Sequence, residues 1–101
     1  MKIDVTQVLK NFNDIVVQDE KGKEITLRAA FTNGLLTTTP KSRKETGEQK
    51  YERYRLATLI NTTDIPEITP EELQKFRTYI GDVYSPIVVG AAWNLIDSLG
   101  K

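Results

Sequence analysis

Residues Thr69–Leu99, TPEELQKFRTYIGDVYSPIVVGAAWNLIDSL, decide the fold because they contain two successive helix starts. In the first, Thr69 can cap a helix that begins at Pro70, since proline suits the first helical position. Glu72 stands three residues after the cap, where a capping box has Glu or Gln. The pattern predicts a helix over 70–83, whose apolar stripe consists of Leu73, Phe76, Ile80, Val83 and Tyr84.

The second helix start is the Ser-Pro pair at 85–86, which predicts a helix over 86–99. Its apolar stripe consists of Val88, Ala91, Ala92, Leu95, Ile96 and Leu99. Ile87, Val89 and Trp93 fall partly outside this stripe, so the helix is apolar over much of its circumference. Such a helix is either the central element of the core or one face of a protein interface, and both interpretations remain open.

Two further helices are predicted upstream. The first covers 27–39 and ends before Pro40, with an apolar face of Leu27, Ala30, Phe31, Gly34 and Leu35. The stretch 41–47 has no apolar residue and is predicted to be a solvated loop. The second helix covers 48–61, and its apolar members are Tyr51, Tyr54, Leu56, Leu59 and Ile60.

The first 26 residues predict a β-hairpin. Two β-prone runs, 15–18 and 24–27, enclose a polar loop that contains Gly22. A lone hairpin is marginally stable in water, so this one has to pack on helices. The predicted fold is therefore mainly α (α+β), with one globular domain over 1–101: a β-hairpin region at 1–26 and four helices in a compact arrangement.

Composition limits the chemistry that is available. The chain has no cysteine and no histidine, so it has no thiol nucleophile, no thiolate or imidazole metal ligand and no imidazole acid–base group. The carboxylates are scattered, and no spacing among them indicates a catalytic pair. We therefore expect a protein that is not an enzyme and that uses no cofactor or metal.

Basic residues and tyrosines gather between residues 41 and 55. Six cations outnumber the three acidic residues Glu45, Glu48 and Glu52. The six are Lys41, Arg43, Lys44, Lys50, Arg53 and Arg55, and Tyr51 and Tyr54 stand among them. Basic charge combined with aromatic rings is typical of nucleic-acid binding. The net charge of the whole chain is zero, however, which favours a solvated, ion-paired surface instead.

Five segments, in order along nearly the whole chain, resemble a group of small proteins of tailed bacteriophages and prophages. They are Val5–Lys10, Lys21–Leu27, Lys50–Ala57, Ile68–Leu73 and Tyr84–Trp93. The resemblance implies an adaptor role in particle assembly or host takeover, in the cytoplasm of a bacterial host or in the virion. It supplies no catalytic or binding residue.

The favoured hypothesis is a non-enzymatic phage or prophage protein-binding module, acting in virion assembly or in modulating a host protein. Ile87, Val89 and Trp93 are the first contact candidates, and Arg53 and Tyr54 are the second. The alternative is a nucleic-acid-binding accessory protein that uses the six basic residues of segment 41–55. Self-association through the last helix is a further alternative. No membrane association is expected, because the longest apolar run is far shorter than the roughly 20 residues that span a bilayer.

Overall fold

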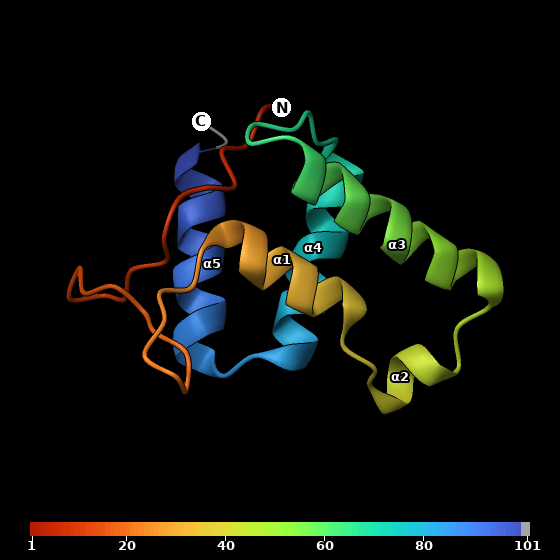
Figure 1. Cartoon of the computed structure of the whole chain (residues 1–101), viewed down its shortest axis with the longest axis horizontal. Helices are drawn as coiled ribbons and strands as arrows, with labels where there is room; N and C mark the ends of the chain where they lie inside the picture. Colours follow the sequence, from red (N-terminus) through yellow and green to blue (C-terminus); the bar gives the residue numbers. More distant parts are fainter. Residues whose placement is uncertain (100–101) are drawn as a thin grey trace.

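Threonine side chains define where four of the helices begin. A computed structural model describes residues 1–99, and the helices in that range are α1 (Leu27–Leu36), α2 (Pro40–Arg43), α3 (Gly47–Thr62), α4 (Pro70–Val83) and α5 (Pro86–Leu99) (Figure 1). The N-caps of α1 to α4 are Thr26, Thr39, Thr46 and Thr69. The last three form complete capping boxes, with Ser42, Gln49 and Glu72 as the third helical residues.

The mainly helical fold is confirmed, and the predicted bounds of α4 and α5 match those of the structure. Helix α3 is one residue longer at each end than predicted. The expected helix over 27–39 was wrong at its end, because α1 stops at Leu36. The expected loop over 41–47 was also wrong in its first part, which belongs to α2. The reason is that Thr39 and Pro40 form the same pair of cap and proline that begins α4, and Ser42 is buried.

The first 26 residues pair through isolated β-bridges instead of the two strands of the expected hairpin. Leu9, Val17 and Ile25 form a closed ring of backbone hydrogen bonds. The N–H of Leu9 donates to Ile25 at 2.8 Å, that of Ile25 to Val17 at 3.0 Å, and that of Val17 to Leu9 at 2.8 Å. All three side chains are buried in the core. The turn that links Val17 to Ile25 contains Gly22, whose φ of +78° favours glycine.

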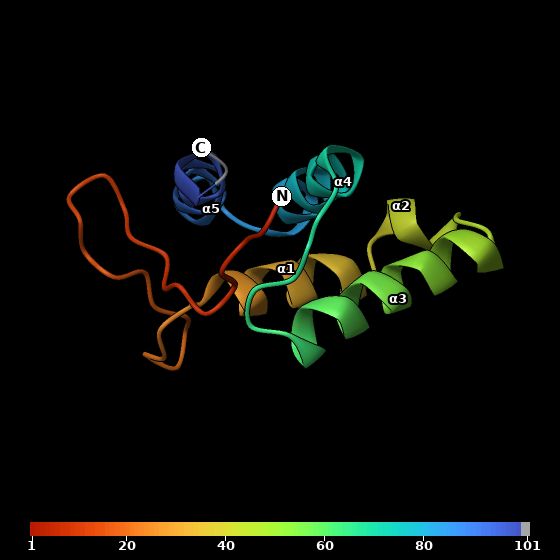
Figure 2. The ribbon, with the colours of Figure 1, turned by 90° about the horizontal axis from the view of Figure 1, so that it is seen from above.

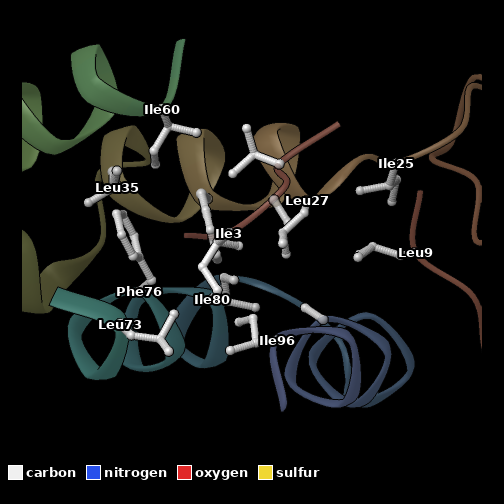
Figure 3. Packing of buried hydrophobic residues seen from close by; sticks show 14 of the residues in the cluster. Ile3, Leu9, Ile25, Leu27, Leu35, Ile60, Leu73, Phe76, Ile80 and Ile96 are labelled. Carbon is white, nitrogen blue, oxygen red and sulfur yellow. The ribbon is translucent and has the colours of Figure 1, made fainter. Parts of the chain in front are cut away.

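The helices form two layers, with α1 and α3 in one and α4 and α5 in the other (Figure 2). The radius of gyration is 13.0 Å, which is the value expected for a compact chain of about 100 residues. Phe31 of α1 stacks on Phe76 of α4, with ring centroids 4.4 Å apart. Around this pair lie buried aliphatic side chains such as Ile60 and Ile80, together with Ile3 from the N-terminal segment (Figure 3).

Gly34 sets the distance between the two layers. A Cβ atom at this position would lie 3.2 Å from the backbone nitrogen of Ile80, which is too close for ordinary packing. Glycine therefore lets α1 approach the backbone of α4 directly. No helix among residues 1–99 has the length and apolar character needed to cross a membrane.

Candidate functional site: two surfaces at opposite ends

Helix α5 is an outer helix with one buried side. Val88, Ala91, Ala92 and Ile96 face the core, as the stripe predicted. On the opposite side, Ile87 is 57% exposed and Trp93 is 39% exposed. Val89 is partly buried against the core, so it does not share the outward position expected for it as a contact residue. The apolar surplus of α5 therefore faces solvent and does not form the centre of the fold.

A loop that the sequence did not single out adds to this surface. Phe12 is 89% exposed and Ile15 is 60% exposed, in the turn that the bridge between Lys10 and Val16 closes. The Asn11 side chain shapes this turn, since its Oδ1 accepts hydrogen bonds from the N–H groups of Asn13 at 2.8 Å and Ile15 at 3.2 Å. The sequence signal was a large aromatic residue between two turn-forming asparagines.

Phe12 and Ile87 face one groove of about 260 Å³ between the loop and α5. Gly90 and Ala91 also line this groove. A Cβ atom placed on Gly90 would meet nothing within 4 Å, so the monomer's packing gives no reason for glycine in mid-helix. We call Phe12, Ile87, Gly90 and Trp93 the α5 face. It combines exposed apolar side chains with a position where another backbone can approach closely.

Trp93 is held in place by α4. The guanidinium of Arg77 lies 5.9 Å from the centroid of the indole ring, a cation–π contact. Arg77 also forms an ion pair with Asp97, one turn after Trp93 on α5. A Cβ atom on Gly81 would touch the indole at 3.8 Å, which places the ring over α4. The tryptophan is therefore half exposed in a restrained orientation, as an anchor residue would be.

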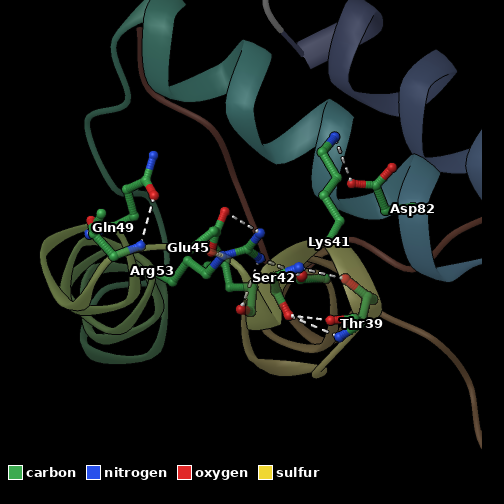
Figure 4. A network of polar contacts seen from close by, with 10 residues as sticks. Thr39, Lys41, Ser42, Glu45, Gln49, Arg53 and Asp82 are labelled. Carbon is green, nitrogen blue, oxygen red and sulfur yellow. Dashed lines mark hydrogen bonds and ion pairs between the residues drawn. The ribbon is translucent and has the colours of Figure 1, made fainter.

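Arg53 lies in the interior, not on the surface as predicted for a contact residue (Figure 4). Its guanidinium donates to the two carboxylate oxygens of Glu45 at 2.6 and 3.0 Å and to the carbonyl oxygen of Leu35 at 3.2 Å. It also stacks 3.8 Å from the ring centroid of Tyr79. The hydrogen bonds from Arg53 lower the pKa of Glu45 below its ordinary value. Arg53 therefore joins α3 to α1 and α4, and its burial does not fit the expectation that it contacts a partner or nucleic acid.

The buried side of α3 was predicted correctly only for Leu56 and Ile60. It consists of Arg53, Leu56, Ala57 and Ile60, which recur at helical spacing. Tyr51 and Tyr54, which were expected on the apolar face, are 67% and 65% exposed. The helical spacing of this buried side is difficult to recognise in the sequence, because it includes Arg53 and a charged residue is normally assigned to solvent.

The remaining basic residues divide into two groups. Lys41 is paired with Asp82 at 3.5 Å, and Arg55 is paired with Glu72 at 3.3 Å. Arg43, Lys44 and Lys50 are exposed and make no ion pair within residues 1–99. We call these three cations, with Tyr51 and Tyr54, the basic surface.

A cavity of about 280 Å³ opens where α1, α2 and α3 meet. Arg43 reaches it from α2 and Lys50 from α3, and residues Thr37 and Thr38 of the connecting segment complete that wall. Two cations that are seven positions apart in sequence therefore face the same opening.

The α5 face and the basic surface lie at opposite ends of the molecule's 40 Å axis (Figure 1). The structure therefore separates Ile87 and Trp93, the first contact candidates, from Arg53 and Tyr54, the second. Among residues 1–99, no three acidic side chains converge in a group that could hold a metal ion.

No family model, curated protein or solved structure matches this chain. Its function is accordingly inferred from the two surfaces.

Proposed function

We propose that this chain is a non-enzymatic protein-binding module of a bacteriophage or prophage. It acts in virion assembly or by modulating a host protein, and it works in the cytoplasm of the bacterial host or as part of the virion. The observation that carries the proposal is the α5 face, where the exposed side chains of Phe12 and Ile87 line one groove together with the unhindered Gly90, and the exposed Trp93 lies on the side of α5 towards α4. Apolar clusters of this kind on small proteins commonly mark interaction sites.

The chemistry of the α5 face favours an apolar partner segment. Phe12 and Ile87 flank a groove whose size suits one large apolar side chain of the partner. Gly90 lets the partner's backbone come close to α5. The charged neighbours are already paired, Lys10 with Asp14 and Arg77 with Asp97, so they offer little to an ionic ligand. The partner we propose is a protein with an amphipathic helix or strand.

Matched variants test this function. Tagged protein is captured from nuclease-treated lysate of infected or lysogenic bacteria, as wild type and as the double variant Phe12→Ser/Ile87→Ser. The control is Ile65→Ser, because Ile65 is 52% exposed and lies outside the α5 face. We expect a phage or host protein to be retained by the wild type and by the control, and to be lost from the double variant.

Two results would contradict the proposal. One is a partner that the double variant retains as well as the control does. The other is a molecular mass in solution that corresponds to two copies for the wild type and one for the double variant. That mass would show that the α5 face pairs with itself.

A further inference from the structure

We propose that the basic surface binds single-stranded nucleic acid, with phosphate groups on Arg43, Lys44 and Lys50 and bases on Tyr51 and Tyr54. This inference is independent of the α5 face, which lies at the other end of the molecule. It differs from the expectation based on six basic residues, because three of those residues already have acidic partners. Arg53 is buried on Glu45, while Lys41 and Arg55 are paired with acidic side chains.

Charge is the first reason. Arg43, Lys44 and Lys50 have no acidic partner within residues 1–99, so their charge is available to a ligand. Arg43 and Lys50 line the same cavity, where Thr37 and Thr38 supply further polar groups. The Glu45 carboxylate also lines it, and both of its oxygens accept hydrogen bonds from Arg53. A phosphate group carries the negative charge and the acceptor oxygens that such a site binds.

The order of side chains around α3 is the second reason. Each residue turns the helix by about 100°, so Lys50 lies between the buried Arg53 and the exposed Tyr54. Tyr51 follows Tyr54 around the same exposed side, because residues three apart are neighbours on a helix. A single strand of nucleic acid with one phosphate at the cavity would therefore contact Lys50 first, and then the rings of Tyr54 and Tyr51.

Two adjacent exposed tyrosines favour nucleic acid over an acidic protein segment. Aromatic rings offer stacking surfaces to the bases of a single strand, and this stacking is tolerant of sequence. An acidic peptide would use the three cations and would gain little from the rings. Duplex DNA is disfavoured, because its bases are already stacked and its recognition requires a longer basic surface.

The experiment measures binding of a labelled 15-nucleotide oligo-dT by fluorescence anisotropy, at 50 and 200 mM salt. With three phosphate contacts to a single strand, the wild-type affinity is expected to fall roughly 20-fold over this range. The variant Arg43→Gln/Lys44→Gln/Lys50→Gln should lose most of the binding and most of the salt dependence. Tyr51→Ala/Tyr54→Ala should weaken binding at least about fivefold for each ring and should leave the salt dependence unchanged.

Two control variants make equivalent substitutions at positions outside the basic surface. Lys2→Gln/Lys21→Gln/Lys23→Gln removes the same charge from exposed positions among the first 26 residues, and Phe12→Ala removes an exposed ring. Both should bind as the wild type does. The proposal is overturned if 50 mM salt permits no binding, or if the charge control weakens binding as much as the test variant. It is also overturned if poly-glutamate of equal charge displaces the oligonucleotide as well as unlabelled oligo-dT does, which would indicate an acidic protein ligand.

Discussion

The carboxylate of Glu45 and the guanidinium of Arg53 meet in a two-point contact, at 2.6 and 3.0 Å, where the two side chains are only 17% and 9% exposed. Paired hydrogen bonds of this geometry are among the strongest that side chains form. Glu45 comes from the turn before α3, whereas Arg53 also reaches the carbonyl oxygens at the end of α1. This pair holds the walls of the cavity that Arg43 and Lys50 line.

Removing the Arg53 side chain should be strongly destabilising. Arg53→Ala leaves the Glu45 carboxylate and the carbonyl oxygens of Gly34 and Leu35 without their donor in a buried position. We expect the free energy of unfolding to fall by about 3 kcal/mol, as measured by urea denaturation. The control is Arg55→Ala, which breaks an exposed pair and should cost less than about 1 kcal/mol. Equal losses in the two variants would show that the Arg53 contact contributes no more than a surface ion pair.

The same contact predicts a pH dependence. The folded pKa of Glu45 lies below its ordinary value of 4.5, because Arg53 donates hydrogen bonds to the ionised form. The ionised carboxylate therefore stabilises the fold fully above about pH 4.5, and this contribution is lost as the pH falls through the folded pKa. Urea denaturation at pH 7, 5, 4 and 3 should show a stability difference between wild type and Glu45→Gln that shrinks below pH 4.5. A difference that grows on acidification would have the wrong sign.

Gly34→Ala should separate the two helical layers. The added methyl group would lie 3.2 Å from backbone atoms of Tyr79 and Ile80, and backbone cannot move aside as a flexible side chain can. Overpacking of this kind costs about 1–3 kcal/mol. Thermal unfolding should show a lower midpoint for this variant. An unchanged midpoint would mean that α1 and α4 shift apart without cost.

Gly90→Ala is expected to act in the opposite direction on stability. Nothing lies within 4 Å of the added methyl group, and alanine is favoured over glycine in a helix by up to about 1 kcal/mol. The variant should therefore be more stable to urea than the wild type. If a partner's backbone approaches α5 at this point, the same variant should bind that partner more weakly in the capture experiment. Greater stability with unchanged capture would place the partner elsewhere.

The helix starts could be predicted from sequence because capping is a local interaction. Thr69 and the two residues at 70 and 72 contain all the groups that begin α4, and the structure has the same bounds. The same chemistry at Thr39 is harder to identify from sequence, since a proline after an apolar stripe also indicates a helix end. Here the proline both follows one helix and begins the next.

The surfaces were less predictable because they depend on contacts between distant segments. The side of α3 that is buried is determined by the partners of Arg53, which come from α1, α4 and the turn at Glu45. Arg53 falls at the helical spacing of Leu56, Ala57 and Ile60, but a charged residue is normally assigned to solvent. The stripe on α5 left open whether Ile87 is buried or exposed, and the structure exposes it. Its neighbour Phe12 lies 75 positions away in the chain, and only the fold brings the two to one groove.

The ring formed by Leu9, Val17 and Ile25 has a consequence for how this protein can diverge. Each of the three residues uses both its N–H and its C=O within the ring, so the two loops between them contribute nothing to its closure. Insertions, deletions and substitutions in either loop would leave the three anchoring positions and the core beneath them intact. The loop that carries Phe12 and Ile15 is thus free to change its recognition chemistry as a partner changes, at little risk to folding.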